Sequence, residues 1–204
     1  MLPAVPDTSG PPQPTLRERT REAVRDEVRR HAIELFTERG FDATRTDDIA
    51  AAVGISPRSF FRYFATKEDV LVGGSIAFGS HVRAALEARP AHEPVWTSLR
   101  RALDPLVTAM ADERRQSLET MTIIMSAGSL RAHHFEKHLA WERELVPVVE
   151  QRLEPAHDKR LRAQTLTHTA LACLDVALAA WVESADSVRL SDLLDGVFAQ
   201  VSDL

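Results

Sequence analysis

The stretch from Gly40 to Lys67 constrains the fold most, because its apolar residues fit two short helices joined by a tight turn. Ile49, Ala50 and Val53 recur at the spacing of one helix face. Gly54 follows, and glycine accepts the positive φ angle that a sharp turn requires. A two-helix unit this short cannot bury its own apolar face, so the sequence predicts a third helix and a larger body behind it.

The second of these helices is predicted to begin after Ser56, which can cap it. Pro57 suits its first position, where no N–H bond is lost. Three aromatic side chains are expected to be buried, and the polar side chains between them are expected to be exposed. The expected buried residues are Phe60, Phe61 and Phe64, and the expected exposed ones are Arg58, Ser59, Arg62 and Tyr63. Such a helix is suited to enter a groove of DNA.

The composition is that of an ordinary soluble globular protein, with 204 residues, 44% hydrophobic and 27% charged. The single cysteine, Cys173, excludes an internal disulfide framework and fits a reducing cytoplasm. No apolar run approaches the ~20 residues of a membrane span, and the N-terminus lacks a signal-peptide layout, so we expect a cytoplasmic protein without membrane contact. Because the net charge is −5, DNA binding would depend on a few individually positioned Lys and Arg side chains and not on a broad basic surface.

Apolar residues at three- and four-residue spacing predict an all-α fold, because no strand alternation appears. Leu16–Arg39 is expected to supply the third helix of the motif, and Gly40 to end it. Residues 1–15 contain five prolines and are expected to be a disordered tail. The later helices are expected at Val70–Ala88, Pro94–Ala111, Asp112–Ala127, Leu130–Leu153, Asp158–Ser184 and Ser191–Val201.

Residues ~20–70 resemble the DNA-binding domain of the tetracycline-repressor-like (TetR) family. The residues that carry the resemblance are Ala32, Leu35, Phe36, Arg39-Gly40-Phe41, Thr44, Ile49-Ala50, Val53-Gly54-Ile55-Ser56, Phe60-Phe61-Arg62-Tyr63-Phe64 and Lys67-Glu68. The resemblance implies an N-terminal three-helix helix-turn-helix domain over residues 16–68. It also implies a C-terminal helical ligand-binding and dimerisation domain over residues 69–204. The chain departs from the family at Arg45, where Thr or Ser is usual, and at Phe61, where Tyr is usual. The first departure leaves Thr44, with Asp47 three residues later, as the expected cap of the second helix.

The family resemblance implies a homodimeric transcriptional regulator, most often a repressor, that binds a palindromic operator in double-stranded DNA. Pro57–Tyr63 would enter the major groove, where Arg58 and Arg62 would read base edges. Phosphate contacts would fall to Thr44, Tyr63 and Lys67, and Ser59 could serve either purpose. The full expected DNA-binding set is Thr44, Arg45, Pro57, Arg58, Ser59, Arg62, Tyr63 and Lys67.

The same resemblance implies a pocket for a small, largely apolar effector between the later helices. The candidate lining residues are Trp96, Met121, Met125, His134, Phe135, His138, Trp141 and Asp175. The last two helices are expected to pair across a two-fold axis through Ala170, Ala177, Trp181, Leu194, Val197, Phe198 and Val201. The helix over Val70–Ala88 would transmit the signal, and its glycines Gly73, Gly74 and Gly79 indicate a bend or close packing.

Three clustered histidines, His133, His134 and His138, support a rival interpretation as a helical metal-dependent hydrolase. His134 and His138 have a spacing that can hold a metal on one helix face. Phe135 stands where a metalloprotease motif requires glutamate, and no second cysteine or clear carboxylate pair completes the ligand set. We therefore predict no enzyme activity, no cofactor and no metal. A third interpretation is an activator, or a head domain that contacts a protein partner.

Overall fold

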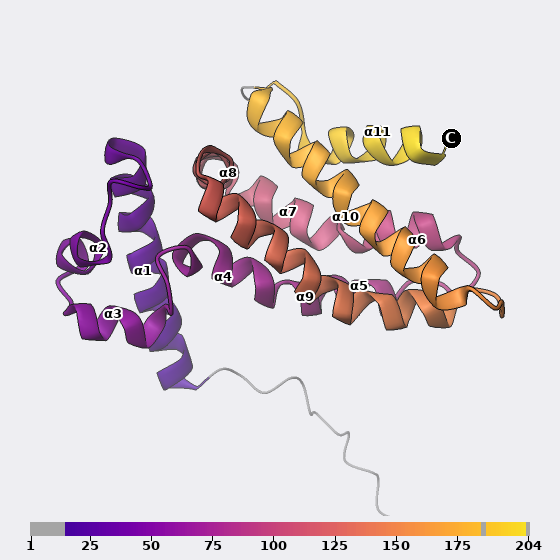
Figure 1. Cartoon of the computed structure of the whole chain (residues 1–204), viewed down its shortest axis with the longest axis horizontal. Helices are drawn as coiled ribbons and strands as arrows, with labels where there is room; N and C mark the ends of the chain where they lie inside the picture. Colours follow the sequence, from indigo (N-terminus) through magenta and orange to yellow (C-terminus); the bar gives the residue numbers. More distant parts are fainter. Residues whose placement is uncertain (1–14, 185–186, 203–204) are drawn as a thin grey trace, which may run out of the picture.

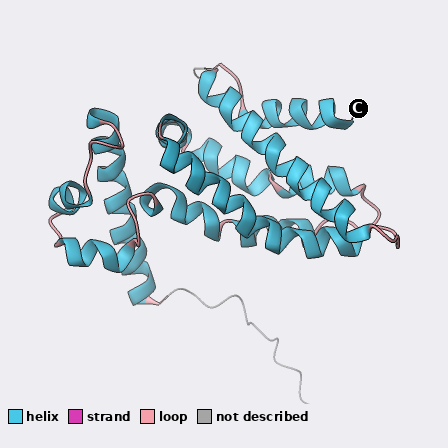
Figure 2. Ribbon diagram, viewed as in Figure 1, coloured by secondary structure: helices cyan, strands magenta, loops and turns pink. Residues whose placement is uncertain are grey.

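The computed structural model describes residues 15–184 and 187–202, with the backbone alone for residues 74–77. Within these ranges the chain forms eleven helices. Figure 2 shows helices and loops without strands in the described chain, so the all-α prediction is confirmed. The helices are α1 Leu16–Arg39, α2 Thr46–Val53, α3 Pro57–Tyr63, α4 Asp69–Ala77, α5 Gly79–Glu87, α6 Val95–Ala102, α7 Asp104–Asp112, α8 Arg114–Ser126, α9 Gly128–Arg152, α10 Lys159–Glu183 and α11 Leu190–Ser202.

Helix α1 has the predicted bounds, because both of its ends carry a stop signal. Thr15 and Glu18 form a reciprocal capping box, in which the Glu18 N–H donates to the Thr15 hydroxyl and the Thr15 N–H donates to the Glu18 carboxylate. Gly40 ends the helix with a φ of 84°. Of the tail predicted for residues 1–15, all but Thr15 lies outside the described residues.

Two predicted helices are each divided in two. The helix predicted over residues 94–111 ends at Ala102, and α7 restarts with Pro105 in its first turn, where the missing N–H is tolerated. The helix predicted over residues 70–88 is interrupted at Phe78, between α4 and α5. Gly79 follows that break and packs closely on Trp141: a Cβ atom there would lie 2.6 Å from Trp141 Cδ1. Close packing therefore explains Gly79.

Helices α1, α2 and α3 lie together at one end of the molecule and are called the head below (Figure 1). Their shared core consists of apolar side chains that are at most 5% exposed: Val28, Ala32, Ile33, Phe36, Phe41, Ile49, Phe60 and Phe64. The turn between α2 and α3 uses Gly54 with a φ of 72°, as its position predicted. Helix α4 leads out of the head into the remaining helices, α4 to α11, which are called the body.

The body is organised around α9 and α10, two long helices that pack along each other (Figure 1). Contrary to the sequence-based expectation, α10 is by length and composition alone long and apolar enough to cross a membrane. In the most apolar 18-residue stretch of this helix, 44% of the residues are buried inside the protein. The same composition is expected of a helix that packs on several neighbours at once, and α10 contacts α6, α8, α9 and α11.

Most residues of the predicted dimer surface on the last two helices are packed within the single chain. Ala170, Ala177, Trp181, Leu194 and Phe198 are at most 4% exposed, and only Val197 and Val201 are half-buried. Helix α11 is held on α6 by Trp96, whose indole N–H donates to the Phe198 carbonyl over 3.2 Å. Arg100 of α6, 7% exposed, also donates to Asp195 of α11 over 2.7 Å.

Candidate nucleic-acid interface and effector cavity

The start of α3 is fixed by a side-chain cap, as its sequence predicts. The Ser59 N–H donates to the Ser56 hydroxyl over 3.1 Å, and Pro57 occupies the first helical position. Phe60 and Phe64 are 0% and 2% exposed, so they anchor the helix on the head. The cap and the two buried rings together fix which face of α3 points outward.

The prediction that Phe61 is buried is wrong, because its side chain is 53% exposed. Phe60 and Phe64 lie one turn apart on one face, whereas Phe61 lies between that face and the arginines Arg58 and Arg62, with its ring edge-to-face against Phe60 at 5.5 Å between ring centres. Both arginines are exposed. The outward face of α3 therefore presents two guanidinium groups beside an aromatic ring, and we call Arg58, Phe61 and Arg62 the reading face.

Tyr63 lies at the edge of the reading face and is half-buried. Its hydroxyl accepts a bond from the Arg62 guanidinium over 3.4 Å, and the Arg62 carbon Cζ lies 5.3 Å from the centre of the Tyr63 ring. The aromatic ring thus supports one of the two arginines. The Arg58 side chain is exposed and makes no hydrogen bond or ion pair with the described residues, so its guanidinium is available to another molecule.

Thr44 does not present its side chain for a phosphate contact, contrary to the prediction. The residue is 1% exposed, and its hydroxyl donates to the Gly40 carbonyl over 2.9 Å. The predicted cap of α2 is also displaced by one residue: the Asp48 carboxylate accepts from the Arg45 N–H over 2.9 Å, and Arg45 itself is the cap residue. The exposed Arg45 side chain remains available beside the head.

Lys67 also has a structural role that differs from the predicted phosphate contact. Its ammonium donates to the carbonyl oxygens of Phe41 and Thr44 over 2.7 and 2.9 Å, and it lies 4.0 Å from the centre of the Phe41 ring. These bonds tie the segment after α3 to the turn after α1. Thr66 and Asp69 cap the start of α4: the Thr66 N–H donates to the Asp69 carboxylate over 2.9 Å, and the Asp69 N–H donates to the Thr66 hydroxyl over 3.2 Å.

A cavity of about 200 Å³ lies in the body where helices α7 to α10 meet α1. Two buried basic side chains, His134 and Lys137, line it together with apolar and other polar side chains. The apolar lining residues are Leu106, Met110, Met121, Ile124, Trp141 and Leu178, and the other polar ones are Arg29, Glu113, Gln116, Ser117 and Thr120. Of the predicted lining residues, Met121, His134 and Trp141 lie in this cavity.

The remaining predicted lining residues lie elsewhere. Phe135, His138 and Asp175 line a shallow groove of about 610 Å³ between α9 and α10, on the side away from the cavity. Trp96 packs on Phe198 with ring centres 4.5 Å apart, and Met125 is half-buried outside both spaces. Lys137, which the sequence reading missed, lies one helical turn before Trp141 and could have been found by that spacing.

A polar cluster of four residues, His134, Lys137, His138 and Asp175, connects the cavity with the groove. The Asp175 carboxylate contacts His134 Nε2 at 3.0 Å and His138 Nδ1 at 3.3 Å. The Lys137 ammonium lies 3.3 Å from His134 Nδ1. Burial lowers the pKa of Lys137 to about 8, and burial together with Lys137 lowers the pKa of His138 to about 4. His138 Nε2 is buried without a partner among the described residues.

The histidines do not form the single group that the hydrolase interpretation requires. His133 turns toward α4, where its Nε2 lies 3.9 Å from Asp69. His134, His138 and Asp175 do offer three possible metal-ligand atoms within 4.8 Å of one another. The Lys137 ammonium is buried 3.3 Å from His134 Nδ1, so it would repel a metal cation bound at that position.

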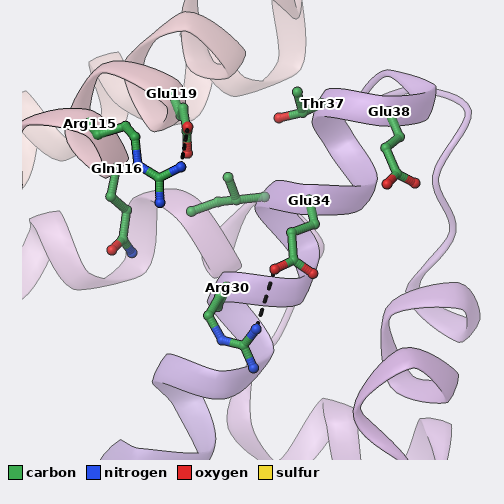
Figure 3. A pocket seen from close by; sticks show the side chains of 8 residues that line it. Arg30, Glu34, Thr37, Glu38, Arg115, Gln116 and Glu119 are labelled. Atoms are coloured by element: carbon green, nitrogen blue, oxygen red, sulfur yellow. Dashed lines mark hydrogen bonds and ion pairs between the residues drawn. The ribbon is translucent and has the colours of Figure 1, made fainter.

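A second hollow, of about 370 Å³, lies between α1 and α8 and is shown in Figure 3. Its labelled side chains are mostly charged and form ion pairs within each helix, Arg30 with Glu34 at 3.3 Å and Arg115 with Glu119 at 3.7 Å. These side chains are largely exposed, with relative side-chain exposures between 41% and 91%. The hollow is therefore a solvated seam between head and body, in contrast to the cavity around Lys137.

Comparisons with known proteins agree with this arrangement of head and body. Residues 29–72 match the family model of bacterial regulatory proteins, tetR family, and residues 93–204 match the model of the MftR C-terminal domain. The HTH-type transcriptional regulator TcmR of Streptomyces glaucescens is 45% identical over 85 residues, which are 42% of this chain and 38% of TcmR. The putative mycofactocin biosynthesis transcriptional regulator MftR of Mycobacterium tuberculosis is 28% identical over 167 residues, 82% of this chain and 83% of MftR.

Solved structures with a similar fold include FadR from Bacillus subtilis in complex with stearoyl-CoA. It matches with a TM-score of 0.57 and 18% identity, over 85% of this chain and 95% of that one. NalD, the secondary repressor of the MexAB-OprM efflux pump in Pseudomonas aeruginosa, matches with a TM-score of 0.56 and 19% identity, over 89% and 96% of the two chains. Identities this low establish a shared fold alone. Because the two family models together span head and body, the chain belongs to the TetR family of bacterial transcriptional regulators.

Proposed function

We propose that this TetR-family regulator is a ligand-responsive repressor that binds a palindromic operator as a homodimer. In this proposal residues 16–68 bind DNA, and residues 69–204 bind the effector and dimerise in the cytoplasm. The observation that carries the proposal is the reading face of α3, where Arg58 and Arg62 stand exposed while Phe60 and Phe64 fix the helix from behind.

The reading face has the chemistry to distinguish base pairs in a major groove. An arginine can donate two bonds to the O6 and N7 atoms of guanine, and an apolar ring can contact the methyl group of thymine. Arg58 has a free guanidinium for the first role, and Phe61 has an exposed ring for the second. The overall charge of −5 makes these placed contacts more important than general attraction to phosphate.

The experiment that tests DNA reading compares Arg58→Ala with wild-type protein on operator and random duplexes, by fluorescence anisotropy at fixed salt. Loss of one bidentate arginine–guanine contact should weaken operator binding by roughly 1–3 kcal/mol. Binding to random DNA should change much less, because no base is read there. Equal losses on both duplexes would show that Arg58 contacts only the backbone.

For the homodimer we propose the outer face of α9 and α10 in place of the predicted surface on α10 and α11. Phe135 and Leu139 of α9 are 58% and 52% exposed, and Leu161 and Val176 of α10 are 64% and 56% exposed. Large apolar side chains gathered on one exposed face indicate an interaction surface. The groove of about 610 Å³ between the two helices lies on this face, with Ala172 in its floor. A second copy would place two such helix pairs together as a four-helix bundle.

The dimer proposal is tested with Leu139→Glu, which places a charge at the centre of this face. The variant should sediment as a monomer at concentrations where wild-type protein is a dimer, and operator affinity should fall because the two heads are no longer linked. Leu16→Glu is the matched control, since Leu16 is a 72% exposed leucine at the start of α1. If Leu139→Glu stays dimeric, the interface lies elsewhere.

We further propose that the cavity around Lys137 is the effector site, because it touches the head directly. Arg29 of α1 lines the cavity and donates to the Val70 carbonyl in α4 over 3.3 Å. If α1 and α4 can adopt two relative arrangements, an effector that binds one of them more tightly increases its population. The fraction of molecules whose heads are positioned to bind DNA changes accordingly. We propose no catalytic role for the histidine cluster, since His133 is turned away and Lys137 opposes a metal.

A further inference from the structure

Lys137 is a buried cation without a carboxylate partner in contact. The residue is 3% exposed, and its ammonium has hydrogen-bond contacts only to the His134 ring among the described residues. Its other neighbour is the Trp141 ring, whose centre lies 5.0 Å away. A buried ammonium is costly unless an anion compensates it, and such groups gather at functional sites. The burial of this ammonium and its position in the cavity therefore favour an anionic group from another molecule as its partner.

Asp175 does not fill this role, because its carboxylate is already shared between two imidazoles. Its oxygens lie 3.0 Å from His134 Nε2 and 3.3 Å from His138 Nδ1. A His134 ring that donates from Nε2 to Asp175 presents an unprotonated Nδ1 to the Lys137 ammonium, 3.3 Å away. Asp175 thus orients His134 and leaves at least one Lys137 N–H bond for the cavity.

The rest of the cavity defines what is attached to the anionic group. Six large apolar side chains contribute to its lining, so a substantial part of the ligand beyond the anionic group must be apolar. The volume of about 200 Å³ lies below the ~300–1,000 Å³ that is usual for ligand pockets, so the ligand must be small. A neutral ligand would leave the ammonium uncompensated, and a cationic ligand would be repelled by it.

We propose that the effector of this regulator is a small amphiphilic carboxylate, such as a medium-chain or aryl-alkyl acid, whose head group pairs with Lys137. This inference rests on the proposed effector role of the cavity. The His134 ring, held by Asp175, positions the ammonium toward the carboxylate, and the apolar lining residues contact the chain.

The test uses octanoate and 4-phenylbutyrate as probes, with 1-octanol and octanoyl-CoA as comparisons, and follows tryptophan fluorescence because Trp141 lines the cavity. Wild-type protein should bind at least one of the two acids at least tenfold more tightly than 1-octanol. Lys137→Met should lose that preference, whereas Arg131→Met, which removes an exposed cation from the same helix, should keep it. Octanoyl-CoA distinguishes a free acid from a thioester, which carries no carboxylate at its acyl end.

A second readout needs no substitution in the cavity. Because burial lowers the pKa of Lys137 to about 8, affinity for the acid should fall between pH 7 and pH 10, while affinity for 1-octanol should not. The titratable and charged groups around Lys137 are His134 and His138 on its own helix, Asp175 on α10, and Arg29 and Glu113 in the lining of the same cavity.

The inference is overturned if 1-octanol binds as tightly as the acids, if Lys137→Met binds the acids like wild type, or if neither acid binds at millimolar concentration. Tighter binding of octanoyl-CoA than octanoate, unaffected by Lys137→Met, would also overturn it. Operator binding is measured separately in the presence of each acid. If an acid binds through Lys137 but does not change operator binding, the proposed regulation is contradicted. The inference that the cavity binds a carboxylate would still hold in that case.

Discussion

The contact between Gly79 and Trp141 yields a quantitative prediction about how α5 packs on α9. A methyl group at position 79 would lie 2.6 Å from Trp141 Cδ1 and 2.9 Å from Nε1, and both are too short for real atoms. Trp141 is 1% exposed, so its rigid indole cannot move into solvent. Overpacking of a core costs typically ~1–3 kcal/mol. We expect Gly79→Ala to reduce the free energy of unfolding by about 2 kcal/mol.

Gly73→Ala is the matched control, because the added methyl group makes only ordinary van der Waals contacts there. A methyl group there would lie 3.7 Å from Asp69 Cβ, which is an ordinary contact. Gly73 is inside α4, where alanine is favoured over glycine by about 1 kcal/mol. The two substitutions should therefore change stability in opposite directions.

The assay is thermal unfolding of the three proteins at one concentration, since dimerisation makes the midpoint concentration-dependent. For a chain of this size about 1 kcal/mol corresponds to ~2–4 °C, so Gly79→Ala should lower Tm by about 4–8 °C and Gly73→Ala should raise it by about 2–4 °C. In a Trp141→Leu background, where the indole is absent, Gly79→Ala should cost less. Equal shifts for both glycines, or the same cost without the indole, would refute the packing argument.

Two further predictions concern charged groups. Lys67→Met should lower the free energy of unfolding by about 1–3 kcal/mol, because it removes the ammonium bonds to the Phe41 and Thr44 carbonyls, and chemical denaturation measures this. The slope of log operator affinity against log salt concentration should be the same for Lys67→Met and wild type. A slope reduced by ~1 would show that Lys67 contacts a DNA phosphate after all. Burial lowers the pKa of His138 from an ordinary 6.5 to about 4 in the folded protein. As the pH falls, the unfolded chain therefore takes up this proton at a higher pH than the folded protein does. The free energy of unfolding that is present above pH 6.5 should be lost as the pH falls toward 4. His138→Gln should flatten that loss in urea titrations, and parallel curves for both proteins would contradict it.

The head was largely predictable from sequence because its signals are local. Gly54, Ser56 and Pro57 specify the turn and the start of α3 through their own backbone preferences. Phe61 was misassigned because adjacent aromatic residues were grouped by type, although neighbours on a helix lie about 100° apart around its axis. Thr44 and Lys67 look like surface residues in the sequence, and only the fold shows that each bonds to backbone carbonyls.

The body was predictable as helices but not as surfaces. An apolar helix face does not reveal whether it packs on its own chain or on a partner, so Leu194 and Phe198 were assigned to a dimer surface that α6, α7 and α10 already cover. The pairing of Asp175 with His134 and His138 joins α10 to α9 across more than thirty-five residues of sequence, and no local pattern encodes it. The buried position of Lys137 is likewise a product of that helix pairing.

The central claim, that α3 reads an operator, is tested most directly by selecting binding sites from a library of random DNA duplexes. Wild-type protein should enrich an inverted repeat, with half-sites that contain guanine where Arg58 is placed. Arg58→Ala should enrich a repeat of the same spacing in which that guanine is no longer required. Enrichment of no common sequence by wild-type protein, or an unchanged motif with Arg58→Ala, would contradict the account.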